Sequence, residues 1–249
     1  MWGGSIPPYT TKIMATFLSQ VQSLTSMTMG TTAGAPTAAE LTQYLTDGVL
    51  DVQNRHLLKR PQDAHMFMKA SGEQTANGYD IGSAKIVSVV RESGTNDDWR
   101  DCVQISPGMQ SRVTDTSSLV YSSKYNPSFT VLDEGGVHVY PAASSGGADS
   151  YKIYYVNNVP VNESDAALDN THSDIAYFPK DLVYLVVLYA AIKSLETKLT
   201  SVVIDDEDIE LVSAMNNSVT TFKQQYETMF RVAPQQHVIK SDALQRSPR

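Results

Sequence analysis

The stretch NPSFTVLDEGGVHVYPAA, residues 126–143, contains two runs in which apolar side chains alternate with small or polar ones. Asp133, Glu134, Gly135 and Gly136 separate the two runs, and Pro141 follows the second. Alternation with a period of two is typical of strands, glycines permit a tight reversal, and a proline ends a strand. The stretch therefore predicts a β-hairpin in the middle of the chain.

Further strand patterns surround this hairpin and are separated by turn signals such as Pro107-Gly108 and Gly146-Gly147. The expected strands are 84–92, 101–105, 118–122, 129–132, 137–140 and 151–156. Short strands at this spacing predict a small antiparallel sheet or barrel.

Helical periodicity precedes the strands. Residues 13–27 place apolar side chains three and four positions apart, and residues 37–58 repeat the pattern after Thr37 and Glu40, which have the spacing of a capping box. The apolar segment 62–72 fits a short helix or a first strand, and its periodicity does not separate the two at this length.

Helical patterns also follow the strands. Pro179 and Asp181 suit the first turn of a helix that ends near Leu199, and its middle, 182–192, is apolar on nearly every face. The acidic run 205–208 suits the start of a last helix, whose narrow apolar stripe continues to Met229. The segment TSVVI, 200–204, is expected to join the two helices as a hairpin.

These patterns predict an α+β fold in which N-terminal helices and a C-terminal helix hairpin form a helical core with an inserted β-sheet or small barrel. The expected parts are an N-terminal arm (1–12), N-terminal helices (13–72), an inserted β domain (73–160), a loop (161–178), the helix hairpin (179–231) and an extended C-terminal tail (232–249).

Composition excludes several classes of function. With 19 basic and 27 acidic residues among 249, the net charge of −8 disfavours a broad grip on nucleic acid phosphates. Cys102 is the single cysteine, so one chain has neither an internal disulfide nor a thiolate-rich zinc site. The longest apolar run has 11 residues, whereas a bilayer span needs about 20. The N-terminus does not have the pattern of a secretory signal peptide, and no membrane association is expected.

The sequence contains no phosphate-binding loop, nucleophile elbow or paired metal-binding histidines. One acidic cluster could in principle hold a hard cation, although its spacing matches no calcium loop and a solvated loop explains it better. It comprises Glu163, Asp165, Asp169, His172 and Asp174. His138 and Cys102 fit strand positions better than catalytic ones, and the tyrosines of 121–155 fit packing or a protein interface better than base stacking. We expect no enzymatic activity, no metal and no cofactor.

Taken together, the hairpin 127–141, the segment YYV at 154–156 and the run FPKDLVYLVVLYAAIKSL at 178–195 resemble head-to-tail connector proteins of tailed bacteriophages, also called adaptor or neck proteins. The resemblance covers roughly residues 37–230. It implies a virion structural protein that forms a ring, commonly a dodecamer, beneath the portal. Its helices would line or surround the channel through which double-stranded DNA passes without sequence-specific binding.

The same resemblance implies the partners: the portal protein, the next neck or tail-terminator ring, and further copies of the chain. The tail would dock on the portal through Gln235, Gln236, His237, Val238, Ile239, Leu244 and Arg246. The apolar helix needs cover on more than one side, either from its own sheet and a neighbouring helix or from another subunit. In a ring it would pack against a neighbouring subunit through Leu182, Leu185, Val186, Tyr189 and Ile192. The protein would be assembled in the host cytoplasm and reside at the head-to-tail junction of the virion. One alternative is a tail or tail-terminator ring subunit. Alternatives from another class of protein are a tail-associated hydrolase or a sugar-binding module.

Overall fold

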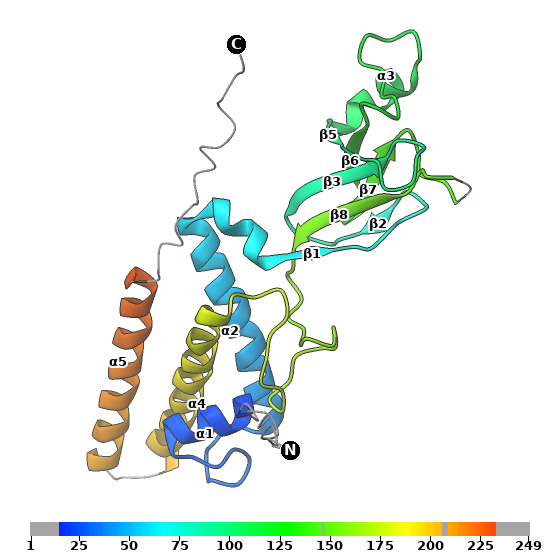
Figure 1. Cartoon of the computed structure of the whole chain (residues 1–249). Helices are drawn as coiled ribbons and strands as arrows, with labels where there is room; N and C mark the ends of the chain where they lie inside the picture. The colour runs from blue at the N-terminus through cyan, green and yellow to red at the C-terminus, as the bar shows by residue number, and fades with distance from the viewer. Residues whose placement is uncertain (1–14, 146, 206–208, 233–249) are drawn as a thin grey trace, which may run out of the picture.

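The structure, a computed structural model, describes residues 15–145, 147–205 and 209–232 (Figure 1). It has a helical body and a β domain that projects from one end of that body. The α+β fold expected from the sequence is confirmed. The expected arm 1–12 lies outside the described residues, as does the expected tail 232–249 except for Val232, which belongs to the last helix instead.

The helical body contains α1 (Phe17–Thr25), α2 (Ala38–Lys59), α4 (Val183–Asp205) and α5 (Ile209–Val232). The capping box at the start of α2 is present: Thr37 Oγ1 accepts a hydrogen bond from the Glu40 N–H, and the Glu40 carboxylate accepts one from the Thr37 N–H. These bonds satisfy backbone donors that the first turn of a helix leaves unpaired.

The apolar helix α4 lies at the centre of the body and packs against α1, α2 and α5. Its coverage by three helices explains why nearly every face of residues 182–192 is apolar. A short 3-10 turn, η4 (Lys180–Leu182), leads into α4. The segment TSVVI belongs to α4 itself, so the prediction that 200–204 joins the helices was wrong; α4 continues to Asp205.

Long polar side chains tie α5 to α2. Tyr226 Oη donates a hydrogen bond to Asp51 Oδ2 at 2.6 Å, and Arg55 bridges Asp51 and Glu227. The Arg55 guanidinium also lies 5.4 Å from the centre of the Tyr226 ring. α5 is therefore held by α4 through apolar contacts and by α2 through charges.

The β domain consists of two four-stranded sheets. The first has the order β1 (Met68–Ala70), β8 (Tyr151–Val156), β3 (Ile86–Glu92), β4 (Trp99–Asp101). The second has the order β2 (Tyr79–Asp80), β7 (Gly136–Tyr140), β6 (Ser128–Leu132), β5 (Val103–Gln104). All neighbouring strands are antiparallel except β5 and β6, which are parallel.

The two sheets enclose one apolar core, to which β3 and β8 contribute from one sheet and β6 and β7 from the other. Tyr151 is buried between the sheets, and its hydroxyl lies 3.0 Å from the Ala76 carbonyl oxygen and 3.2 Å from that of Val137, which share its single hydrogen. Arg91, also buried, donates to the carbonyls of Pro141 and Ala142 and to Asp149. These bonds hold the two layers together.

The predicted hairpin is present as β6 and β7, with the 3-10 turn η3 (Asp133–Gly135) between them. Gly135 has φ +143°, and a Cβ there would lie 2.5 Å from the Gly82 carbonyl oxygen. Only glycine fits this reversal without displacing the neighbouring backbone.

Other strand predictions need correction. Residues 118–122 form turns, since the Ser118 and Tyr121 N–H groups bond to the carbonyls of Asp115 and Ser118. The predicted strand 101–105 is divided between the sheets, as β4 ends at Asp101 and β5 begins at Val103. The ambiguous segment 62–72 contains both the 3-10 helix η1 (Pro61–Phe67) and β1. Two short helical segments, η2 (Pro107–Met109) and α3 (Gln110–Thr114), were not predicted.

Two adjacent chain segments join the β domain to the helical body: η1 with β1, and the chain after β8 (Figure 1). Phe67 packs edge-on against Phe178, with 5.5 Å between ring centres. The buried Gln53 amide donates to the Asn157 carbonyl, and Lys69 pairs with Asp165 at 2.6 Å. Apolar, polar and ionic contacts thus connect the two parts.

Candidate interaction surfaces

The chain around α3 lies at the end of the β domain farthest from the helical body (Figure 1). Large apolar side chains in and beside this part of the chain are exposed. We call residues 105–127, which connect β5 to β6, the tip segment. The exposed apolar residues in or beside it are Val103, Leu119, Val120, Tyr121 and Tyr125. All of them except Tyr125 line a pocket of about 300 Å³, together with Ile105 and the buried Val113. Apolar side chains gathered around a hollow indicate an interaction site.

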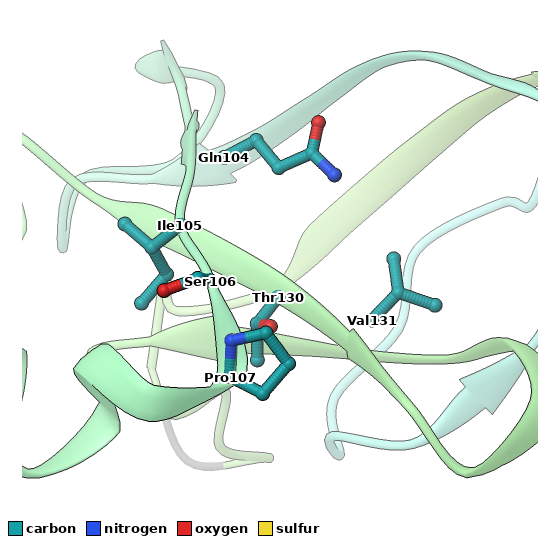
Figure 2. A pocket seen from close by; sticks show the side chains of 6 residues that line it. All are labelled: Gln104, Ile105, Ser106, Pro107, Thr130 and Val131. Carbon is teal, nitrogen blue, oxygen red and sulfur yellow. The ribbon is translucent and has the colours of Figure 1, made fainter.

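A second pocket, of about 360 Å³, lies where the chain leaves β5. Gln104, Ile105, Ser106 and Pro107 line one side and β6 lines the other, with Pro107 beside Thr130 (Figure 2). Thr130 is fully buried, and its Oγ1 has no hydrogen-bond partner within the described part of the chain. The pocket therefore combines the apolar side chains of Ile105, Pro107 and Val131 with polar ones, among them the unused Thr130 hydroxyl.

The pocket also marks an open sheet edge, because β6 is longer than β5. The Ile105 N–H bonds to the Phe129 carbonyl, and the chain then turns away into η2. In a strand, residues two apart direct their backbone groups to the same side, so Val131 directs its N–H and C=O toward the position that β5 would fill if it were longer. Pro107, the residue nearest that position along the chain, has no N–H to offer.

A different surface runs along α5. From Leu211 to Phe230 its solvent-facing side chains are mainly Ser, Thr, Asn and Gln, while Val219, Tyr226 and Phe230 are buried on the other side. The exposed charges in this stretch, Lys223 and Glu227, form ion pairs with Glu196 and Arg55. The outer face of α5 is thus polar but almost free of uncompensated charge.

The residues expected to pack against a neighbouring subunit have intramolecular partners instead. Leu182, in η4, and three α4 residues are buried among α1, α2 and α5, and Tyr189 is half-buried near Tyr226. The three α4 residues are Leu185, Val186 and Ile192. The chain's own helices thus cover side chains for which a second subunit was expected, so a subunit contact would use other residues. Gln235, Gln236, His237, Val238, Ile239, Leu244 and Arg246, predicted to dock on the portal, lie outside the described residues.

The acidic side chains of the loop between β8 and η4 form ion pairs and hydrogen bonds with nearby parts of the chain. Asp165 pairs with Lys69, and Asp174 accepts the Glu163 N–H at 2.7 Å. The hydrogen bond from the Thr171 hydroxyl lowers the pKa of Asp169, although burial opposes this shift. His172 Nδ1 accepts the Asp169 N–H at 3.0 Å. These groups are engaged in loop structure.

The same loop reaches the helical body. The carbonyls of Asn170 and His172 accept the N–H groups of Leu18 and Phe17 at the start of α1. The Asn170 amide donates to the Ala38 carbonyl and to Thr42 Oγ1 on α2. The loop therefore fastens α1 to α2. Within the ranges that the structure describes, no group of three or more His, Cys, Asp or Glu side chains is arranged to hold a metal ion.

The remaining candidate residues, His138, Cys102 and the aromatic side chains, lie in separate places and do not form a common site. His138 lies half-buried on β7, next to Gly78. Burial raises the pKa of the Cys102 thiol to about 12, which disfavours the reactive thiolate. Among the aromatic residues, Phe129 and Tyr151 belong to the core of the β domain, whereas Tyr121 and Tyr125 are exposed near its tip. No helix among the described residues is long and apolar enough to span a membrane.

Neither a scan against protein-family models nor a search of curated proteins finds a match to this chain. The resemblance to phage connector proteins therefore rests on the residues that carry it.

Proposed function

We propose that this chain is a structural subunit of the neck of a tailed bacteriophage. Copies of it form a ring that joins the portal of the capsid to the tail, and double-stranded DNA passes through the ring. Its partners are the portal protein, the next neck or tail-terminator ring, and further copies of itself. In this proposal it is assembled in the host cytoplasm, resides at the head-to-tail junction and has no enzymatic role.

The outer face of α5 carries this proposal. A channel for DNA must neither bind the phosphates tightly nor repel them strongly, and clustered basic or acidic side chains would do one or the other. The face offers uncharged polar groups over a helix of 24 residues, which is about 36 Å long. Asn217, Thr221 and Gln224 represent it, since their spacings of four and three place them on one side of the helix.

The separation of the two parts also supports the proposal. A ring subunit in a stack needs one surface toward its neighbours and another toward the next ring. The helical body and the projecting β domain offer distinct surfaces of different chemistry: the polar face of α5 and the apolar tip segment. Residues 235–246 are proposed to supply the attachment to the portal.

Ring formation on the portal is tested by measuring the mass of the full-length protein mixed with its portal. The expected result is a complex containing several copies of this chain per portal ring. A persistent monomer with no portal binding would contradict the proposal.

The role of the α5 face is tested with the triple variant Asn217→Lys, Thr221→Lys and Gln224→Lys. We expect normal attachment to the portal but slower DNA release from assembled particles, because three lysines per subunit would retain phosphates. A matched control places lysines at three exposed positions of the tip segment, Ser111, Thr116 and Ser117. DNA release equal to that of the control would remove the channel-lining role.

The exposed tip favours one alternative, a tail or tail-terminator ring subunit in which the β domain makes the main contact between subunits. Deletion of residues 233–249 separates the two proposals. The connector proposal predicts loss of portal attachment, whereas the tail-ring alternative predicts no effect on it.

A further inference from the structure

The open edge of β6 has the features of a site that receives an extended peptide. Val131 offers a backbone N–H and C=O on the side where β5 has ended, beside the pocket of about 360 Å³. An added strand uses such backbone groups for affinity and adjacent pockets for its side chains. The buried Thr130 Oγ1, which has no partner among the residues that the structure describes, lines the same pocket and can bond to a polar group of the incoming segment.

The charges beside this edge indicate what the peptide must carry. Asp133 and Glu134 follow β6 directly and are both exposed. A segment that runs along β6 in the direction of β5 therefore needs apolar side chains first, near Ile105 and Val131, and then a cationic one near the carboxylates. Such a segment complements the site in both shape and charge.

One part of the chain outside the described residues has this order. Within 233–249, Val238 and Ile239 are β-branched, which favours an extended strand, and Lys240 follows them. The segment carries Lys240, Arg246 and Arg249 against a single acid, Asp242, in a chain whose net charge is −8. Its charge is thus opposite to that of the hairpin turn it would meet.

The position and length of the segment fit a contact between copies. α5 ends at Val232, at the end of the helical body from which the β domain projects (Figure 1). The 17 residues that follow can span up to about 60 Å when extended. In a ring whose subunits all point the same way along its axis, Val232 of one copy therefore lies at the level where the β domain of its neighbour begins.

We propose that residues 238–240 of one copy add a short strand to the open edge of β6 in a second copy. Ile239 lies in the pocket beside Val131, and Lys240 pairs with Asp133 and Glu134. The contact is heterologous, because different surfaces of the two copies meet, and it can therefore link subunits into a ring. This inference concerns copies of the protein that have not met a portal. It gives residues 238–240 a different partner from the portal docking proposed above, so it stands or fails apart from the neck function.

Disulfide trapping between two full-length variants tests this contact. Both carry Cys102→Ser; one also carries Gln104→Cys, at the exposed edge of the pocket, and the other carries Ile239→Cys. Mixed under mild oxidation, they are expected to form a mixed disulfide dimer, because docking raises the local thiol concentration. A matched control replaces Gln104→Cys by Asn217→Cys on α5 and is expected to give a yield at least about tenfold lower.

Charge reversal tests the register. Lys240→Glu in the Ile239→Cys partner should lower the trapped yield roughly two- to fivefold, the range for an exposed ion pair, and Glu134→Lys in the Gln104→Cys partner should restore it. A yield equal to that of the Asn217→Cys control would overturn the proposal. So would a chain carrying both cysteines that closes an intrachain bridge at high dilution, since the tail would then reach its own β domain. Portal binding is measured separately, so the neck proposal and this one can fail independently.

Discussion

The helical body and the β domain differ in how fully they bury their apolar side chains. In the body, α1, α2 and α5 of the same chain surround α4, and residues 182–192 are largely buried. In the β domain the sheets share a closed core, yet the tip segment leaves Leu119 and Tyr125 exposed and β6 keeps an open edge. The difference suggests that the body supplies stability, whereas the far end of the β domain is available for contacts with other chains.

The largest difference between the two regions is expected when one leucine in each is replaced by alanine. Leu188 on α4 is fully buried, so Leu188→Ala should lower the free energy of unfolding by about 2 to 5 kcal/mol. Leu119→Ala at the tip should leave it nearly unchanged, since the side chain is fully exposed. Denaturant titration of both variants measures the difference. Equal losses would mean that the tip is part of the folded core.

A second substitution tests how firmly the β domain is closed between its sheets. Arg91→Met removes the donors that serve the carbonyls of Pro141 and Ala142 and the ion pair with Asp149. We expect a loss of about 2 to 3 kcal/mol, because buried acceptors would lose charged donors. Thermal unfolding followed by near-ultraviolet circular dichroism measures it. The conservative Arg91→Lys variant should recover only part of the loss, since it cannot supply the same fork of donors.

A smaller effect is expected where α5 meets α2. Tyr226→Phe removes the hydrogen bond to Asp51 but keeps the buried ring, so the free energy of unfolding should fall by about 1 kcal/mol. Chemical denaturation at neutral pH provides the measurement. A loss as large as that of Leu188→Ala would show that the α5 contact depends on this bond more than on apolar packing.

The smallest expected effect is a pH dependence in the β domain. Burial opposes ionisation of Glu92, but hydrogen bonds from the Ser150 hydroxyl and from the N–H groups of Asp97 and Ser150 outweigh it and lower the pKa of the carboxyl. A carboxyl with a lowered pKa stabilises the folded state above its unfolded value, near 4.3, and this contribution is lost as pH falls through the folded value.

Glu92→Gln removes this titration. When the pH is lowered from about 6 to about 3, a range that includes the unfolded carboxyl pKa, the melting temperature of the variant should therefore fall less than that of the parent chain. Parallel curves for the two proteins would show that Glu92 does not contribute to acid sensitivity.

Local patterns in the sequence predicted the parts of the fold that depend on short-range chemistry. The Thr37 and Glu40 capping box and the hairpin around Gly135 form where expected. The apolar helix beyond Pro179 also forms, although it continues to Asp205. In each case the residues that specify the element also make its contacts, or the pattern is long enough to determine its type.

The predictions that were wrong have two causes: local hydrogen bonds that compete with a strand, and long-range packing that short patterns do not specify. Residues 118–122 have strand-forming side chains, but Asp115 and Ser118 engage nearby N–H groups and hold the segment in turns. The partners of α4 could not be assigned, since periodicity shows that a helix is covered and does not identify the covering chain. The open edge at Val131 required the register of three strands, which short-range patterns do not contain.

The pairing of β1 with β8 places the two crossings of the chain side by side, with Met68 opposite Val156 and Lys69 opposite Tyr155. The helical body meets the β domain through these neighbouring backbones. The core of the body includes Val156, at the end of β8, but no residue of β2 to β7. A two-residue reverse turn could replace everything between them without stretching either end. The β domain is therefore an insertion with adjacent ends. Recombination could exchange it for another domain while α1, α2, α4 and α5 keep their packing.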